Sequence, residues 1–223
     1  MTINGSQPDT LLVSQLRSSW FNLLEKFQAD TNLGESVFAD LIKAYSDTKR
    51  HYHNQHHLQH ILDSLTEVQE LIDDVPALQL CAWFHDYIYD PKAIDNEMES
   101  AIAAERILSR LRVNFDTLRL VQQIILSTRK HEPFLEATDN LIFLDVDLSI
   151  LGTSPDKYLA YSQAIRQEYS HLSDRDYQAG RKQVLTQFLA RDRIYYTDYF
   201  YQRLESTARK NLQTEINNLV TKA

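Results

Sequence analysis

An adjacent histidine and aspartate, His85 and Asp86, follow an apolar run and are the residues of this chain best suited to chemistry. A histidine-rich stretch, 51–60, lies upstream and holds five of the eight histidines. Neutral imidazoles and carboxylates together are typical ligands of divalent transition metals. A further oxygen ligand must then come from elsewhere, and Asp147 is the best candidate. The chain is therefore interpreted as a scaffold that brings three distant stretches together around one ion.

The composition predicts an all-α protein. The 223 residues include only four glycines and five prolines, so long stretches run without a helix breaker. Residues 1–9 are polar and are expected to be disordered. Because no repeat or linker interrupts the remaining chain, we predict a single helical domain over 10–223. Its core is expected at about 50–190, with additional helices at both ends.

Charge and cysteine content limit the partners and the compartment. A net charge of −8 argues against nucleic-acid polymers and anionic membranes, and no apolar run is long enough to span a membrane. A small phosphorylated substrate remains compatible, because a bound metal can outweigh the global charge. Cys81 is the only cysteine, and the N-terminus lacks the pattern of a secretory signal, so a cytoplasmic protein is expected. The oligomeric state, including a homo-oligomer, is left open.

Hydrophobic periodicity indicates which elements carry the candidate ligands. Apolar residues recur at helical spacing over 55–72 and place His57 at the edge of the buried stripe. His53 lies one turn earlier. The run 78–84 is apolar nearly all round, which is typical of a central buried helix. Asp86 follows this run, and a buried carboxylate needs a partner for its charge.

Other signals predict where helices begin and which sides they bury. Residues 31–34 include Gly34 and are expected to break the helical pattern before a helix over 35–45. Ser173 resembles the cap of a helix that runs through Leu189. A helix that opens at residues 95–97 has a predicted core side made of Met98, Ile102, Ala103, Ile107 and Leu111.

The pattern of a histidine, an adjacent His-Asp pair and a later aspartate resembles the HD-domain superfamily of metal-dependent phosphohydrolases. It is most similar to a bacterial subgroup of predicted metal-dependent HD phosphohydrolases. His57 and His85 are 28 positions apart, about the length of a helical hairpin. The resemblance implies an HD-domain-like helical bundle. The segments that carry it are Arg50–Leu58, Trp83–Asp86, Asp95–Glu97, Asp145–Gly152 and Tyr177–Arg181.

The resemblance also implies that His57, His85, Asp86 and Asp147 bind one divalent metal. Asp147 rather than Asp145 matches the last aspartate of the family, although this chain offers both. The other aspartate would then be a helix cap or a hydrogen-bond acceptor beside the site. Mixed nitrogen and oxygen ligands suit Mn, Fe, Co, Ni or Zn better than Ca or Mg.

Hydrolysis of a phosphate ester also needs a base, a leaving-group acid and contacts to the phosphate. Asp86 is a candidate catalytic residue at the metal. Glu97 could orient the water or act as base, with a helix-stabilising acid as the alternative. His131 could protonate the leaving group, or it could simply end a helix. Arg50 and His53 are the substrate-binding candidates, with a surface role for Arg50 and a supporting role beside the metal ligands for His53 as alternatives.

The expected function is a metal-dependent phosphohydrolase that acts on a nucleotide or another small phosphate ester. One alternative is a non-catalytic nucleotide-binding or sensing module with the same fold. A less favoured alternative is an iron-dependent HD-type oxygenase with two metals. His131 is the only histidine between the His85-Asp86 pair and Asp147, so a single metal is favoured.

Overall fold

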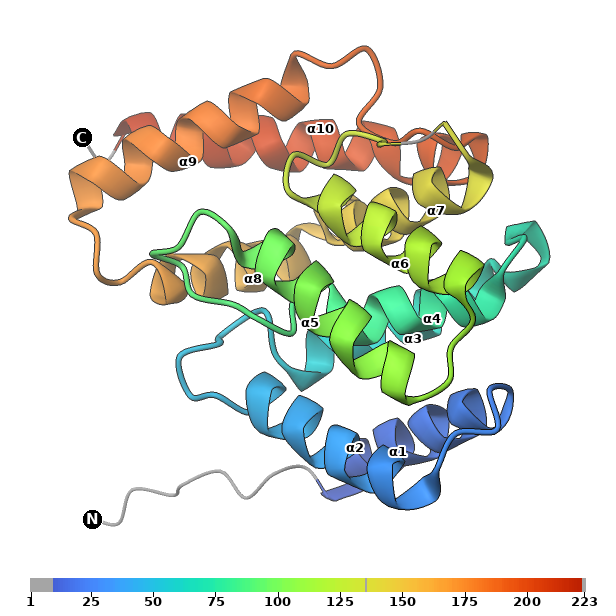
Figure 1. Ribbon diagram of the computed structural model, residues 1–223. Coiled ribbons are helices and arrows are strands. Elements are labelled where there is room, and N and C mark those ends of the chain that lie inside the picture. Colours follow the sequence, from blue (N-terminus) through green and yellow to red (C-terminus); the bar gives the residue numbers. More distant parts are fainter. Residues whose placement is uncertain (1–9, 135, 222–223) are drawn as a thin grey trace. The chain divides into compact units, whose positions relative to one another are not determined.

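The computed structural model describes residues 10–134 and 136–221, and all regular structure in those residues is helical, as the sequence predicts (Figure 1). The helices group into two compact units, Met1–Leu135 and Glu136–Ala223, called unit 1 and unit 2 below. The expected single domain stays a prediction. The expected disorder of residues 1–9 concerns a segment outside the described residues.

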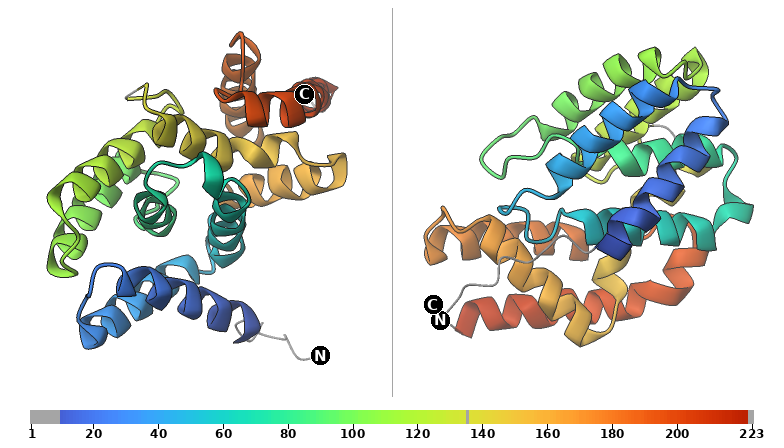
Figure 2. Two further views of the ribbon diagram at one scale, coloured as in Figure 1. Left: turned by 90° about the vertical axis from the view of Figure 1, so that its right-hand side faces the viewer. Right: turned by 90° about the horizontal axis from the view of Figure 1, so that it is seen from below.

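Unit 1 is built around α4, which packs against α3, α5 and α6. The left-hand view of Figure 2 shows α4 end-on between α3 and the α5–α6 pair. The described helices of this unit are α1 (Thr10–Glu25), α2 (Thr31–Tyr45), α3 (Gln55–Glu67), the short 3-10 helix η1 (Gln69–Leu71), α4 (Val75–Phe84), α5 (Asn96–Arg110) and α6 (Phe115–Thr128).

Aromatic packing fixes the C-terminal half of α4. The Trp83 ring is fully buried and meets the Trp20 ring of α1 edge-on, with ring centroids 5.2 Å apart. It meets the Phe38 ring of α2 in the same way at 6.2 Å. Each such pair contributes about 0.5–1.5 kcal/mol beyond its buried area. The sequence prediction of a central buried helix is confirmed, and the residues that follow Phe84 start from a rigid support.

The expected break at residues 31–34 is wrong, because these residues form the first turn of α2. The Asp30 carboxylate accepts a hydrogen bond from the Leu33 N–H at 2.8 Å and so caps the helix. The Gly34 carbonyl accepts a hydrogen bond from Trp20 Nε1 at 3.1 Å. A Cβ at Gly34 would lie 2.7 Å from Leu24 Cδ1. Gly34 therefore permits α1 and α2 to approach closely and does not end a helix.

In unit 2, α10 packs along both η2 and α9. Figure 1 shows α9 and α10 side by side. The described helices of this unit are α7 (Thr138–Asp147), the 3-10 helix η2 (Leu148–Gly152), α8 (Pro155–Glu168), α9 (Asp174–Leu189) and α10 (Asp198–Thr221). Ser173 accepts a hydrogen bond from the Asp176 N–H at 3.2 Å, so the predicted cap of α9 is confirmed.

An ion pair on α10, formed by Glu205 and Arg209, fixes the loop between α9 and α10. The buried carboxylate of Glu205 accepts hydrogen bonds from the N–H groups of Ile194 and Tyr195 at 3.0 and 3.3 Å. Arg209 donates to Glu205 at 2.7 Å and to the Leu189 carbonyl at 3.0 Å. The last turn of α9 and the loop that follows are thereby fixed on α10.

The contact between η2 and α10 is close enough to require a glycine. A Cβ at Gly152 would lie 2.5 Å from Leu204 Cβ and 3.0 Å from the Leu204 carbonyl oxygen. The Asn211 side chain of α10 also donates a hydrogen bond to the Leu151 carbonyl at 2.9 Å. Since backbone atoms of both elements are involved, neither side can yield easily to a larger residue.

We expect Gly152→Ala to lower the free energy of unfolding by about 1–3 kcal/mol, because the added methyl group overlaps α10. Urea unfolding followed by circular dichroism would measure this. The matched control is Gly180→Ala inside α9, where a Cβ meets nothing within 4 Å. That change should raise stability by about 0.5–1 kcal/mol, because alanine favours helix. Equal effects of the two substitutions would contradict the close packing at Gly152.

Candidate metal centre

His85 directly follows α4, and its ring is oriented by the end of that helix. Its backbone N–H donates to the Cys81 carbonyl at 2.9 Å, and its ring Nδ1 lies 3.1 Å from the Ala82 carbonyl oxygen. A carbonyl can only accept, so Nδ1 carries the hydrogen of this bond. In the neutral ring, Nε2 then bears a lone pair, which is the form that binds metals. His85 is only 2% exposed.

His57 presents its own Nε2 to His85. It is the third residue of α3 and is 4% exposed. Asn54 caps this helix by accepting the His56 N–H at 2.9 Å, and its amide donates to the His51 carbonyl at 2.9 Å. The two Nε2 atoms of His57 and His85 are 3.3 Å apart.

Asp86 completes a compact group of three within unit 1. Its Oδ2 lies 3.0 Å from His85 Nε2 and 3.3 Å from His57 Nε2. Adjacent ligands around a metal with bonds of about 2.1 Å are separated by about 3.0–3.4 Å, depending on the coordination geometry. All three separations lie in this interval. Nitrogen and oxygen lone pairs repel each other at such distances, so protons or a metal ion must lie among them.

The pKa of Asp86 also reflects the groups that face its carboxylate. Burial raises its pKa, but electrostatic attraction to the neighbouring His85 and His53, with hydrogen bonds from His57 and His85, lowers the pKa well below the usual range. The carboxylate is therefore ionised, as a metal ligand must be. Its other oxygen, Oδ1, makes no hydrogen bond to the described residues, and the side chain is 18% exposed.

The two aspartates of α7 in unit 2 have different surroundings. Asp145 is fully buried and accepts hydrogen bonds from the N–H groups of Tyr196 and Thr197, both at 2.7 Å. The Thr197 hydroxyl also donates to it at 2.6 Å. Burial raises the pKa of Asp145 to about 6, against the lowering effect of these donors. Both oxygens of Asp145 thus accept hydrogen bonds from the residues that precede α10. Asp147, in contrast, is the last residue of α7 and is partly exposed.

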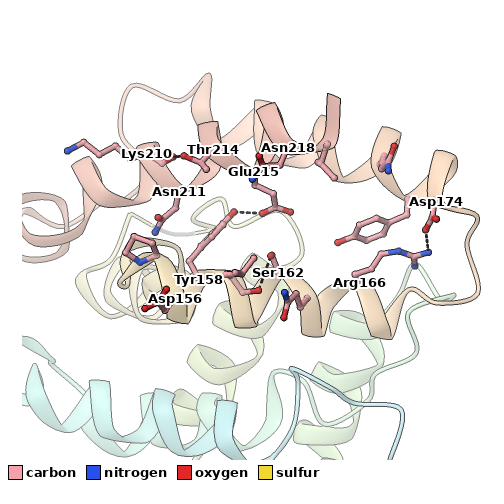
Figure 3. A pocket seen from close by; sticks show the side chains of 16 residues that line it. Asp156, Tyr158, Ser162, Arg166, Asp174, Lys210, Asn211, Thr214, Glu215 and Asn218 are labelled. Atoms are coloured by element: carbon pink, nitrogen blue, oxygen red, sulfur yellow. Dashed lines mark hydrogen bonds and ion pairs between the residues drawn. The ribbon is translucent and has the colours of Figure 1, made fainter. Parts of the chain in front are cut away.

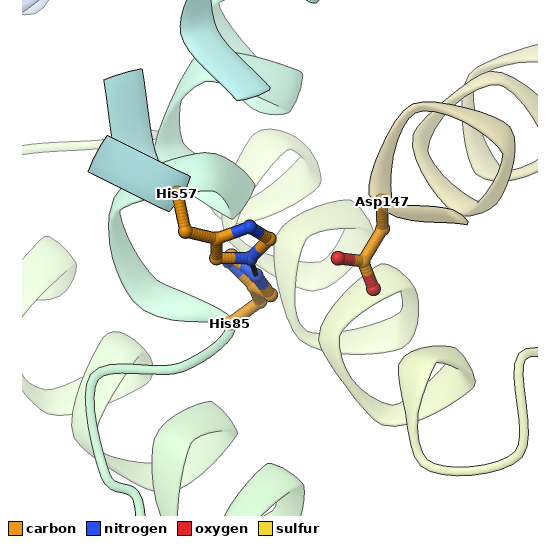
Figure 4. A group of neighbouring side chains, drawn as sticks. All are labelled: His57, His85 and Asp147. Atoms are coloured by element: carbon orange, nitrogen blue, oxygen red, sulfur yellow. Dashed lines mark hydrogen bonds between the residues drawn. The ribbon is translucent and has the colours of Figure 1, made fainter. Parts of the chain in front are cut away.

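Figure 4 draws the side chains of His57, His85 and Asp147. Two imidazole rings and one carboxylate are donors that could hold a metal ion. The two histidines belong to unit 1 and Asp147 belongs to unit 2. Donors of this mixed kind suit Mn, Fe, Co, Ni or Zn better than Mg or Ca.

The two substrate-binding candidates lie against the group of His57, His85 and Asp86. The Arg50 side chain is buried and donates to backbone carbonyls, among them that of Asp86 at 2.7 Å. The His53 ring packs edge-on against the His57 ring, with centroids 5.6 Å apart. It also faces the Tyr89 ring at 4.4 Å.

The other two catalytic candidates lie at helix ends. Glu97 is in the first turn of α5, where its charge favours the helix. His131 follows α6 with φ of 49°, in the left-handed region, and its N–H donates to the Thr128 carbonyl at 3.2 Å. This conformation commonly ends helices and usually belongs to glycine. His131 therefore terminates α6, whatever further role its ring has.

Sequence reasoning missed Tyr45 as a residue that supports the centre. Its fully buried hydroxyl donates to the Trp83 carbonyl at 3.2 Å and so satisfies a carbonyl in the last turn of α4. The available signal was the residue type itself, because a buried tyrosine usually has a hydrogen-bond partner. The asparagine at position 54 was likewise a signal for the start of α3.

A separate cavity of about 610 Å³ lies within unit 2, among α8, α9 and α10 (Figure 3). The Glu215 carboxylate at its side receives hydrogen bonds from Tyr158 and, at 2.8 Å, from Arg181 Nε. Arg166 pairs with Asp174 at 2.7 Å. None of the candidate metal or catalytic residues lines this cavity, so it is not part of the candidate centre.

No family model, curated protein or solved structure matches this chain. In the part of the chain that the structure describes, no helix has both the length and the apolar character needed to cross a membrane.

We expect Asn54→Ala to reduce stability by about 1 kcal/mol and to weaken cobalt binding by about tenfold or more, because the cap of α3 sets the position of His57. The matched control is Asn114→Ala. Asn114 caps α6 by accepting the Thr117 N–H at 3.0 Å. The control should lose similar stability and keep its cobalt affinity, measured by visible absorption. Equal cobalt affinities in both variants would show that the cap does not position a ligand.

Proposed function

We propose that this chain is a metal-dependent phosphohydrolase of the HD type that acts on a nucleotide or another small phosphate ester. The observation that carries the proposal is the group of two imidazole nitrogens and one carboxylate oxygen within 3.3 Å of one another in unit 1. The resemblance of the sequence pattern to HD-domain phosphohydrolases supports the same reaction class.

The proposed ligands of a single divalent metal are His57, His85 and Asp86 from unit 1 and Asp147 from unit 2. The chemistry of these groups, imidazole nitrogens together with carboxylate oxygens, supports this choice. So does the engagement of Asp145, whose two oxygens accept three hydrogen bonds from Tyr196 and Thr197. Asp145 would have to give up these bonds, and with them the start of α10, to become a ligand.

A divalent metal at this site would supply a water of lowered pKa and positive charge beside a phosphoryl oxygen. Asp86 Oδ1, which is not engaged by either imidazole, accepts a proton from the attacking water. As the water oxygen bonds to phosphorus, the ester P–O bond breaks and the leaving oxygen takes a proton. His131 is the candidate donor of that proton, and Glu97 is the candidate for orienting the water.

The proposed substrate is small, because the net charge of −8 disfavours nucleic-acid polymers. The proposed compartment is the cytoplasm, since Cys81 is the only cysteine and is buried within α4. A homo-oligomer is compatible with this function but is not required by it.

We expect His85→Ala and Asp86→Ala each to lower phosphohydrolase activity by a factor on the order of 10²–10⁴, since ligation or proton transfer is lost. Metal-loaded protein would be screened against phosphomonoesters, nucleotides and cyclic phosphodiesters, and metal content would be measured by elemental analysis. His56→Ala is the control, because His56 is exposed on α3 next to His57. Activity that survives both substitutions would refute the proposal.

Two other results would point to the alternative functions. Tight nucleotide binding without turnover under several metals would favour a sensing module. Two metal ions per chain would favour an iron-dependent oxygenase.

A second prediction separates the two aspartates of α7. Asp147→Asn should abolish binding of one metal equivalent with a small effect on stability, because the amide is a poor metal ligand. Asp145→Asn should instead keep metal binding and lower stability by about 1–3 kcal/mol, because its amide group would face N–H donors. Elemental analysis and urea unfolding measure the two effects. The reverse pattern would make Asp145 the ligand.

A further inference from the structure

Arg50 joins the two segments of unit 1 that carry the proposed ligands. Its guanidinium Nη1 donates to the Asp86 carbonyl at 2.7 Å, and Nη2 donates to the Tyr87 carbonyl at 2.9 Å. The same Nη1 lies 3.4 Å from the His53 carbonyl oxygen. Arg50 itself precedes α3, whereas Asp86 and Tyr87 follow α4. One side chain thus connects the approach to His57 with the turn that contains Asp86.

The Arg50 guanidinium is held in one orientation. It lies over the Tyr45 ring at 5.2 Å and over the Tyr89 ring at 5.4 Å, and the residue is only 8% exposed. A planar guanidinium can donate two bonds at once to neighbouring carbonyl oxygens, which a lysine ammonium cannot do with the same geometry. No carboxylate among the described residues pairs with it, and its hydrogen-bond partners are main-chain carbonyls.

The carbonyl of Asp86 belongs to the same residue whose Oδ2 lies near both imidazoles. A bond to this carbonyl fixes the Asp86 backbone, and therefore the direction in which its side chain leaves the chain. The separations of 3.0 and 3.3 Å from Oδ2 to His85 and His57 depend on that direction. A shift of a few tenths of an ångström would change all ligand distances around a shared ion.

We infer that Arg50 is a positioning residue for the metal ligands, which it serves by bridging the His57 and His85-Asp86 segments, rather than a substrate-binding residue. This inference rests on the proposed metal-binding function. Groups that orient metal ligands without touching the metal commonly change metal affinity by about 10–100-fold when they are removed. Arg50 acts through main-chain carbonyls, which every residue has. No particular partner residue therefore reveals this role in the sequence.

The test compares cobalt binding by wild-type protein, Arg50→Lys and Arg50→Ala after removal of metals with a chelator. Both variants should bind Co²⁺ about 10–100-fold more weakly, with an altered visible spectrum, because the ligand geometry is no longer fixed. Free guanidinium ion at low concentration should partly restore affinity in Arg50→Ala, since it can occupy the vacated space. Arg50→Lys keeps the charge and the aliphatic part of the side chain. If Arg50→Ala does not fold, the cobalt affinity of Arg50→Lys decides the test.

Two controls separate positioning from general effects. Arg17→Ala removes an exposed arginine of α1 that pairs with Glu35, and should leave cobalt affinity unchanged. Leu16→Ala removes a fully buried side chain of α1, a helix that carries none of the proposed ligands, and lowers stability. A folded Leu16→Ala protein with normal cobalt affinity would show that lost stability alone does not weaken the site.

The outcomes are distinguishable. If wild-type protein binds Co²⁺ and Arg50→Lys binds it equally tightly, the positioning role is refuted. Unchanged cobalt affinity with a raised KM for a phosphate ester would also refute it and would make Arg50 a substrate-binding residue. If wild-type protein itself binds no metal, the proposed function fails, and the inference fails with it. Weaker cobalt binding in both Arg50 variants, with unchanged binding in the controls, supports the inference.

Discussion

In unit 1, the Nε2 atoms of His57 and His85 and the Oδ2 atom of Asp86 lie within 3.3 Å of one another in largely buried surroundings. The hydrogen bond from His85 Nδ1 to a carbonyl leaves its Nε2 as an acceptor in the neutral ring. Such a group is stable only when positive charge lies among its members, either as protons or as a metal ion. The buried helix α4 and the hydrogen-bonded carbonyls around its end fix the backbone from which His85 and Asp86 reach into this group.

Much of this centre could be predicted from residue types and spacing. The apolar run before His85 predicted a buried helix, and the proximity of His57, His85 and Asp86 follows from two helices packed as a hairpin. The links that fix the geometry could not be predicted. Arg50 bonds to carbonyls of Asp86 and Tyr87, 36 and 37 positions away, and any residue provides a carbonyl. The engagement of Asp145 likewise depends on residues 51 and 52 positions later returning to α7.

Two errors of the sequence analysis have a common physical cause. Gly34 was interpreted as a helix breaker, but it lies inside the first turn of α2 where α1 approaches closely. Met98 and Ile102 were placed on the core side of α5, yet they are 45% and 50% exposed. Small residues of α5, including Ala101 and Ala104, are buried instead. In both places close approach between helices favours small side chains, which hydrophobic periodicity does not weigh.

Asp145 and Asp147 are two residues apart on α7. The Asp145 carboxylate accepts hydrogen bonds from the two residues that precede the 24-residue helix α10. Moving the start of α10 away from α7 would break these bonds and leave the buried Asp145 carboxylate without donors, which is energetically costly. The attachment of the C-terminal helix is thus tied to the charge state of a helix that ends in Asp147.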